Sequence, residues 1–262
     1  MNLLFRRLGL CLAILLGGST LFGQIVNIED RRSFRADTIA WFGNVQLGFN
    51  LVDNGDPVYT LNGGINVEYQ RMRHLFLSFS RFNLVRVVDQ DFVNDGFQHL
   101  RYNYTLGPRL TWEAFAQAQY NEKIKLRFRG LIGTGPRWSL LPEASKQRAF
   151  LGALYMYEYN EDNVATETNP DALDYLRDHR LSAYLALRFA IGANLVLAST
   201  SYFQPVIDNF ADQRLSSQTT GQLTITEKLK FTTTFSILYD TRVPEGVPNT
   251  TYRWINGIRW NW

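Results

Sequence analysis

The chain has 262 residues, of which 14% are aromatic, including 6 Trp, 13 Tyr and 18 Phe. Its formal net charge of +3 is small, and its Lys and Arg residues are scattered, so we exclude nucleic acid as a partner. Its single cysteine, Cys11, lies in the N-terminal apolar run, so the sequence predicts neither a disulfide nor a metal site built on cysteine.

The first segment, residues 1–23, has the pattern of a secretory signal peptide. Arg6 and Arg7 precede the apolar run Leu8 to Leu16, and small or uncharged residues follow this run. The run is too short for a membrane-spanning helix, which needs about 20 apolar residues. We therefore expect export and removal of residues 1–23, followed by a short periplasmic segment over residues 24–37. A buried N-terminal helix is the less favoured alternative.

From residue 38 onward, apolar and polar residues alternate with the period of two that is typical of β-strands. Several segments exceed the five or six residues of an average strand and approach the nine to eleven or so that cross a membrane at a tilt. We count about twelve segments. The clearest cover residues 39–50, 61–70, 99–106, 112–120, 124–132, 180–189, 230–239 and 251–262, and less regular ones lie near 74–88, 148–159, 195–206 and 213–226.

Each segment presents one aromatic or aliphatic face and one polar face. In a soluble sandwich the aromatic face would be the core, whereas in a transmembrane barrel it meets lipid and the polar face lines the lumen. The excess of Trp and Tyr favours the barrel, because these side chains are stable at the boundary between hydrocarbon and water. We predict an all-β fold, an antiparallel up-and-down transmembrane β-barrel of about 12 strands over residues 38–262, in the outer membrane of a Gram-negative bacterium.

An even number of strands places both termini on the periplasmic side. Alternation then places the longer predicted links on the cell exterior. These links cover residues 89–95, 160–175, 208–212 and 242–249. The link between Leu140 and Gln147 is long for the periplasmic side.

Two regions of the sequence resemble a known family. The stretches Phe97–Tyr104, Trp112–Gln117 and Arg129–Arg137 form the first region, and Leu238–Pro244 with the final aromatic strand forms the second. Together they look like the salt-induced outer-membrane protein family, a domain of unknown function, in a form found among the Bacteroidetes. The resemblance covers roughly residues 97–140 and 235–262, and it implies an outer-membrane barrel without known catalytic residues.

The final strand carries a second resemblance. Alternate apolar residues that end in an aromatic residue are similar to the C-terminal signal recognised by the outer-membrane barrel assembly machinery. We expect this machinery to be a partner, together with outer-membrane lipid. The predicted assembly signal consists of Tyr252, Trp254, Ile258, Trp260 and Trp262.

The polar faces of the predicted strands carry charged residues that would line the lumen. One interpretation is a basic constriction that favours anions or anionic head groups, because a ring of arginines sets the charge selectivity of a pore. The interpretation that we favour is an internal network of ion pairs, because charges confined in a narrow lumen are usually paired. The candidate lumen-lining residues are Glu68, Arg101, Glu113, Arg127, Arg129, Arg188, Arg253 and Arg259.

An enzyme is the second functional class, because outer-membrane phospholipases with twelve strands use Ser and His. The chain offers His74, His99 and His179, and it lacks the G-x-S-x-G pattern of a nucleophile elbow. The run Asp53 to Asp56 predicts a hairpin turn better than a calcium loop, because the later bidentate Glu is missing. We therefore expect no enzyme activity, no cofactor and no metal.

The leading hypothesis is an outer-membrane barrel with a structural or narrow-pore role for small solutes, linked to envelope or salt stress. The alternatives are a membrane-embedded enzyme that acts on lipid and a soluble periplasmic β-barrel that binds an apolar ligand. The sequence leaves the solute and the oligomeric state open.

Overall fold

The computed structural model describes residues 40–53, 55–87, 90–142, 145–164, 169 and 171–260. The predicted signal peptide, the segment 24–37 and Trp262 lie outside the described residues. Within the described part of the chain, no helix is long and apolar enough to cross a membrane. The one helix described in detail is a single 3-10 turn, η2 (Glu122–Ile124).

The described residues form twelve strands, and most are long enough to cross a bilayer at a tilt. Their bounds are β1 (Ala40–Asp53), β2 (Pro57–Arg71), β3 (His74–Val87), β4 (Gln90–Thr105), β5 (Leu110–Asn121), β6 (Leu126–Ser139), β7 (Arg148–Asn163), β8 (Leu173–Ile191), β9 (Leu195–Pro205), β10 (Gln213–Thr224), β11 (Leu229–Asp240) and β12 (Thr250–Trp260).

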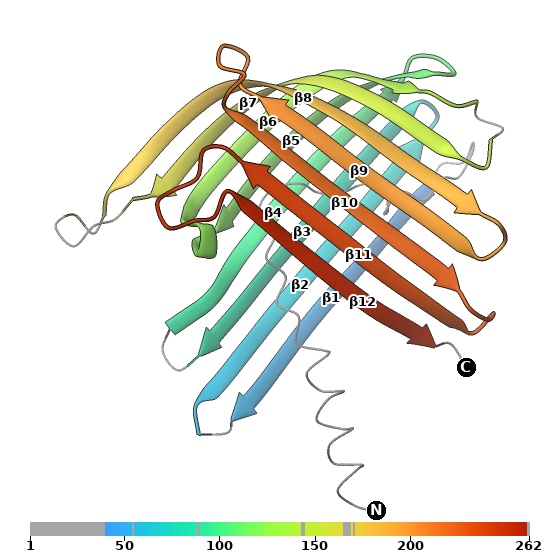
Figure 1. The fold of residues 1–262 in the computed structure, drawn as a ribbon. Helices are drawn as coiled ribbons and strands as arrows, with labels where there is room; N and C mark the ends of the chain where they lie inside the picture. Colours follow the sequence, from blue (N-terminus) through green and yellow to red (C-terminus); the bar gives the residue numbers. More distant parts are fainter. Residues whose placement is uncertain are drawn as a thin grey trace, which may run out of the picture.

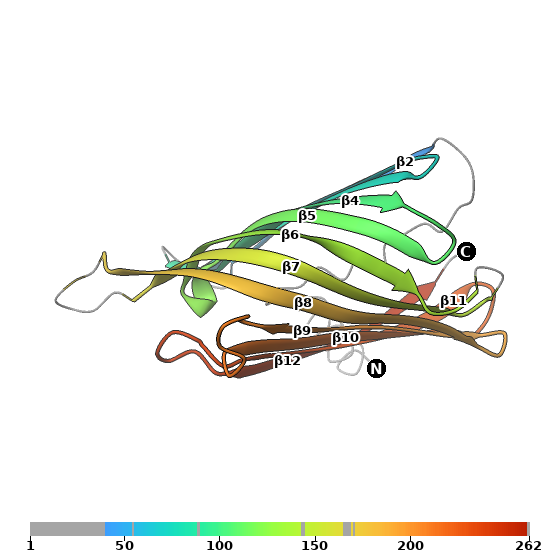
Figure 2. The same ribbon diagram turned by 90° about the horizontal axis from the view of Figure 1, so that it is seen from above.

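Every strand pairs antiparallel with the next strand in the sequence, so the sheet order is β1 to β12 without a crossover. The sheet curls on itself, and Figure 1 shows β9–β12 crossing in front of β1–β4. From above, β9–β12 lie beneath the wall formed by β4–β8 (Figure 2). Among the described residues, β1 and β12 are not hydrogen-bonded to each other. The predicted all-β class, with twelve antiparallel strands in up-and-down order, is confirmed.

Side chains on the outer face of the curled sheet are mainly large and apolar. On β1, Trp41 and Leu47 are 70% and 76% exposed, and on β12 Tyr252 and Ile258 are 77% and 74% exposed. The inner face, in contrast, buries many polar and charged side chains. This distribution is the reverse of that in a soluble sandwich, in which the aromatic face would be buried.

The outer face of β9 and β10 includes a small polar patch. Ser199 Oγ lies 2.9 Å from Thr219 Oγ1, and Ser201 Oγ lies 2.8 Å from Ser217 Oγ. These hydroxyl groups pair across the two strands, so each satisfies its neighbour without water. An apolar environment outside the sheet is therefore compatible with the patch.

One predicted link is corrected by the structure. Residues 89–95 were expected to form a long link, but β4 begins at Gln90 and includes most of this segment. Val93 and Asp95 both point inward and are almost fully buried. A register shift between Val85 and Arg86 in β3 accompanies this pairing. Asp95 faces the interior, and Asn94 on the opposite face donates from its Nδ2 to Glu122 Oε1 at 2.9 Å.

Candidate functional site

The interior of the curled sheet is lined by the inward-facing residue of each alternating pair. Along β5, Glu113, Phe115, Gln117, Gln119 and Asn121 are buried, and the residues between them are exposed or half-buried. Because side chains alternate across a strand, each strand contributes such a column to the interior. The columns on β4–β8 carry most of the buried charges.

Glu113 is the centre of one buried ion-pair group, which we call the Glu113 cluster. Its carboxylate accepts a hydrogen bond from Arg101 Nη1 at 3.1 Å and one from Arg137 Nη1 at 3.2 Å. Tyr184 of β8 donates its hydroxyl to the same carboxylate at 2.5 Å. Since β5 and β8 are not neighbours in the sheet, this last bond crosses the interior.

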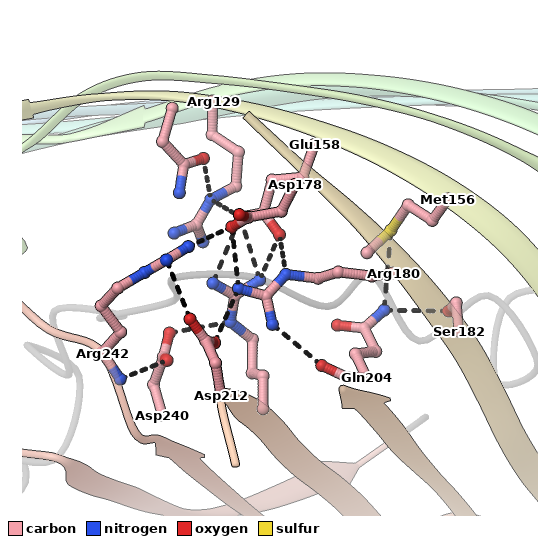
Figure 3. A network of polar contacts seen from close by, with 12 residues as sticks. Arg129, Met156, Glu158, Asp178, Arg180, Ser182, Gln204, Asp212, Asp240 and Arg242 are labelled. Atoms are coloured by element: carbon pink, nitrogen blue, oxygen red, sulfur yellow. Dashed lines mark hydrogen bonds and ion pairs between the residues drawn. The ribbon is translucent and has the colours of Figure 1, made fainter. Parts of the chain in front are cut away.

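Glu158 is the centre of a second group, the Glu158 cluster, and its side chain is fully buried. Its carboxylate oxygens lie 3.0 Å from Arg129 Nε, 2.7 Å from Arg180 Nε and 3.2 Å from Arg214 Nη1. The three arginines come from β6, β8 and β10, so one carboxylate links strands on both walls of the curled sheet. Figure 3 shows the guanidinium groups of Arg129 and Arg180 converging on Glu158.

Aspartates complete the Glu158 cluster at one end of the interior. Arg180 Nη2 lies 3.0 Å from Asp212 and 3.2 Å from Asp178, and Arg214 Nε lies 2.8 Å from Asp240. Arg242, from the connection between β11 and β12, lies 2.9 Å from Asp212 and also pairs with Asp178. With Glu158 and Arg129 included, four carboxylates face four guanidinium groups. Buried charges in such balanced groups avoid most of the cost of an unpaired ion.

Apolar side chains fill the space between the two clusters. Phe115, Leu154, Met156 and Tyr202 are buried there and pack together. The cavity left among them measures only about 20 Å³. A cavity needs roughly 10–15 Å³ of probe-occupied volume to hold one water molecule, so this space admits about one water. These packed side chains therefore leave little room for a solute between the two clusters.

The other half of the interior has a different lining. The inward-facing residues of β10 and β11 are uncharged for most of their length, and they comprise Ser216, Gln218, Thr220, Gln222, Thr232, Thr234 and Ser236. A cavity of about 360 Å³ lies along this side, beneath the connection between β11 and β12. That connection is held across the cavity mouth by Lys125, whose Nζ donates to Glu245 O at 2.8 Å. In Figure 1 the connection lies beside η2.

A family model for proteins of unknown function, DUF481, matches residues 45–261. The chain belongs to this family. The matched region includes nearly the whole of the twelve-stranded sheet and both buried clusters. The region matched by the family model therefore coincides with the twelve-stranded sheet described above.

Other comparisons add little to this assignment. No curated protein matches the chain. Among solved structures, the chain is similar to a NanC porin, with 12% sequence identity and a TM-score of 0.48. That similarity covers 82% of this chain and 100% of the porin chain.

Four of the sequence-predicted lumen residues of this DUF481 chain lie in the buried interior. Glu68 is nearly fully buried, and Arg101, Glu113 and Arg129 belong to the two clusters. Arg253 is half-buried on the inner face of β12, close to Asp95 of β4. The structure thus places five of the eight predicted residues toward a common interior.

The other three predicted residues do not join this group. Arg127 is exposed, because a bulge between Leu126 and Phe128 interrupts the alternation at the start of β6. Arg188 lies on the same face of β8 as Arg180 and Tyr184, but it is near the end of the strand and is exposed. The side chain of Arg259 lies outside the described residues.

Sequence reasoning missed the residues around which the Glu158 cluster forms. A usable signal was present on β7, where Tyr155, Tyr157 and Tyr159 alternate with Met156 and Glu158. A glutamate between aromatic residues of the opposite face is expected to point inward. The missed residues of both clusters are Arg137, Glu158, Asp178, Arg180, Asp212, Arg214, Asp240 and Arg242.

The three histidines considered for catalysis have neutral partners. His99 Nδ1 lies 2.8 Å from Gln117 Oε1 in the interior. His74 and His179 pair with tyrosine hydroxyls at 2.8 and 2.5 Å. Within the described part of the chain, none of them contacts a serine hydroxyl or a carboxylate. The described residues also contain no group of His, Cys, Asp and Glu that could hold a metal ion.

Proposed function

We propose that the chain is an integral outer-membrane β-barrel that provides a narrow passage for small solutes. The observation that carries this proposal is the inverted distribution of side chains, with Trp, Tyr, Leu and Ile outside and hydrogen-bonded charges inside. A lipid environment stabilises the outer face, since apolar surface of this extent is costly in water. The proposal includes export with removal of a signal peptide and recognition of the C-terminal strand by the assembly machinery.

The passage that we propose follows the uncharged half of the interior. Ser, Thr and Gln side chains of β10 and β11 line it, and the cavity of about 360 Å³ forms part of it. Hydroxyl and amide groups along these two strands replace the hydrogen bonds that a solute makes with water. Charged residues also line the cavity, among them Arg129, Asp240 and Arg242 of the Glu158 cluster. The Glu113 cluster braces the opposite half.

Conductance of the full chain in planar bilayers tests the passage. We expect discrete, small openings, and we expect Ser236→Trp to reduce them because residue 236 faces the cavity. Phe235→Trp is the matched control, because Phe235 lies on the outer face of the same strand and does not line the cavity. Protein that is fully inserted in the bilayer yet never conducts would refute the pore and favour a purely structural barrel.

A purely structural role is the second candidate, because the Glu113 and Glu158 clusters with the packed residues between them fill half of the interior. The resemblance to salt-induced proteins suggests that either function belongs to the response to salt stress. Abundance of the protein in the outer-membrane fraction should rise when the cells are grown at higher salt. An unchanged amount would remove the proposed link to salt stress but would leave the barrel proposal intact.

A further inference from the structure

The two ends of the curled sheet carry opposite charge. The five connections that lie toward the right in Figure 1 form what we call the turn rim: residues 71–74, 105–110, 139–148, 191–195 and 224–229. Their described residues include six basic and one acidic residue. The other six connections form the loop rim: residues 53–57, 87–90, 121–126, 163–173, 205–213 and 240–250. The described residues of the loop rim include eight acidic and three basic residues.

Three arginines of the turn rim are exposed and lie on neighbouring connections. Arg71 and Arg73 belong to the connection between β2 and β3, and Arg109 belongs to the next one along the rim. The backbone joins the two connections, because Thr105 N at the start of the second one donates to Arg73 O at 2.9 Å. Among the residues that the structure describes, none of these three arginines has an ion-pair partner.

The tip between the first two arginines is apolar. Met72 is 82% exposed, and it adopts a positive φ of 50° in the tight turn. In water, a methionine exposed between two arginines buries no apolar surface and does not stabilise the fold. At a membrane surface, however, the thioether can enter the apolar layer while the guanidinium groups stay at the head-group level.

A furrow on the outer face begins close to these arginines. The facing residues across four strands are Tyr102, Ala114, Thr134 and Tyr155, so two small residues lie between two large ones. Ala116 continues the floor of the furrow along β5, and the furrow is almost entirely apolar.

One wall of the furrow is a row of aromatic rings. Trp41 packs on Tyr69 with ring centroids 4.4 Å apart, and Phe76 packs on Tyr102 at 4.8 Å. Arg71 follows Tyr69 by two residues on the same face of β2, a distance of roughly 7 Å along a strand. The basic rim and the apolar furrow are therefore within the reach of one lipid molecule.

We propose that this surface is a binding site for an anionic phospholipid, with the phosphate held by Arg71, Arg73 and Arg109 and an acyl chain in the furrow over Ala114 and Ala116. The inference rests on the proposed membrane location, and it identifies the turn rim as the end in contact with the phospholipid leaflet. Arginine suits this role because its guanidinium group binds phosphate oxygens in a bidentate manner. Membrane-embedded proteins commonly hold anionic head groups in basic sites at one surface.

The test uses the full chain inserted into vesicles of phosphatidylcholine mixed with phosphatidylglycerol. The protein is extracted in mild detergent, and the phospholipids that it retains are quantified by mass spectrometry. We expect phosphatidylglycerol to be enriched over its share in the vesicle. In the triple variant R71Q/R73Q/R109Q the enrichment should be lost, because each arginine contributes about fivefold to the binding constant for the anionic lipid.

Two further variants separate the parts of the site. Arg127→Gln is the matched control, because Arg127 is an exposed arginine of β6 beside the loop rim, and it should leave the enrichment unchanged. Ala116→Phe fills the furrow without a change of charge, so it should reduce the retention of both phospholipids. If free inorganic phosphate displaces the phosphatidylglycerol completely, the site recognises phosphate alone and the acyl-chain part of the proposal is overturned.

Equal enrichment in the wild type and the triple variant would overturn the lipid site. Insertion itself is measured separately, by the difference in gel mobility between heated and unheated samples from vesicles of phosphatidylcholine alone. Wild-type protein that fails to insert into any vesicle would refute the membrane barrel, and the lipid site with it. Protein that inserts normally but retains both lipids equally would refute only the lipid site.

Discussion

Removal of the charge on Glu158 is the most direct perturbation of the buried network. The substitution Glu158→Gln keeps the shape of the side chain but leaves three guanidinium groups around a neutral amide. Arg180 retains Asp178 and Asp212, and Arg214 retains Asp240. Arg129 loses its ion pair and keeps the hydrogen bond from its Nε to Asn160 Oδ1 at 2.8 Å, while Asp162 and Asp240 still act on it electrostatically. Arg129 is therefore the stranded buried cation, only partly compensated by these two acids.

Loss of one partner from a buried ion pair costs about 3–5 kcal/mol. Because two of the three arginines keep other acids, we expect the lower end of this range, about 3 kcal/mol of the free energy of unfolding. The assay is urea unfolding of the chain refolded in lipid vesicles, followed by tryptophan fluorescence, with the free energy obtained by linear extrapolation. Adding Arg129→Gln to Glu158→Gln should recover part of the loss, since the stranded cation is then removed.

Glu161→Gln is the matched control for this experiment. Glu161 lies three residues along the same strand, but it pairs at 3.9 Å with the exposed Arg127. Surface pairs of this kind contribute at most about 1 kcal/mol. If Glu158→Gln destabilises the barrel no more than Glu161→Gln does, the cluster does not stabilise the fold and the reasoning above is refuted.

Further outcomes follow from the same geometry. A Cβ at residue 152 would lie 2.1 Å from the ring of Tyr184, so Gly152→Val should lower the free energy of unfolding by about 1–3 kcal/mol, and less in a Tyr184→Ala background. Additive effects in urea unfolding would contradict this contact. Arg242→Ala should speed proteolysis within residues 241–249, because the connection between β11 and β12 then loses its ion pairs with Asp178 and Asp212. An unchanged cleavage rate would show that other contacts hold this connection. Closure of the sheet in lipid predicts that a cysteine at Leu47 of β1 forms an intramolecular disulfide with a cysteine at one position of β12, because unpaired strand edges are costly in hydrocarbon. No disulfide across the full panel of outward-facing β12 positions would refute closure; the panel is Tyr252, Trp254, Asn256, Ile258 and Trp260.

The alternation of side chains was sufficient to predict the strands. On β5 and β11 the predicted faces agree with the structure residue by residue, because nothing interrupts the pleat between Leu110 and Gln119 or along Leu229–Asp240. The number of strands and the antiparallel order followed from the same periodicity. What the sequence could not supply was the register shift at the start of β6, which turns Arg127 outward.

The composition of the ion-pair clusters could not be derived from periodicity. Alternation shows which residues face the interior, but it does not show which residues meet across it. Glu158 and Arg214 are separated by 56 positions, and they meet because the curl of the sheet brings β10 beneath β7. The connection between β11 and β12 contributes Arg242 for the same reason. Contacts that depend on the curvature of a sheet require its three-dimensional form.

The pairing of these charges also limits what a passage through the barrel can select. A pore selects anions strongly when its arginines face the lumen without acidic partners. Here six arginines of the two clusters contact five carboxylates, so their field is largely cancelled within the protein. The remaining lining of β10 and β11 is uncharged over most of its length. In the passage that we propose, we therefore expect selection by size with only a weak preference for anions, and we expect the arginines mainly to hold the two walls of the curled sheet together.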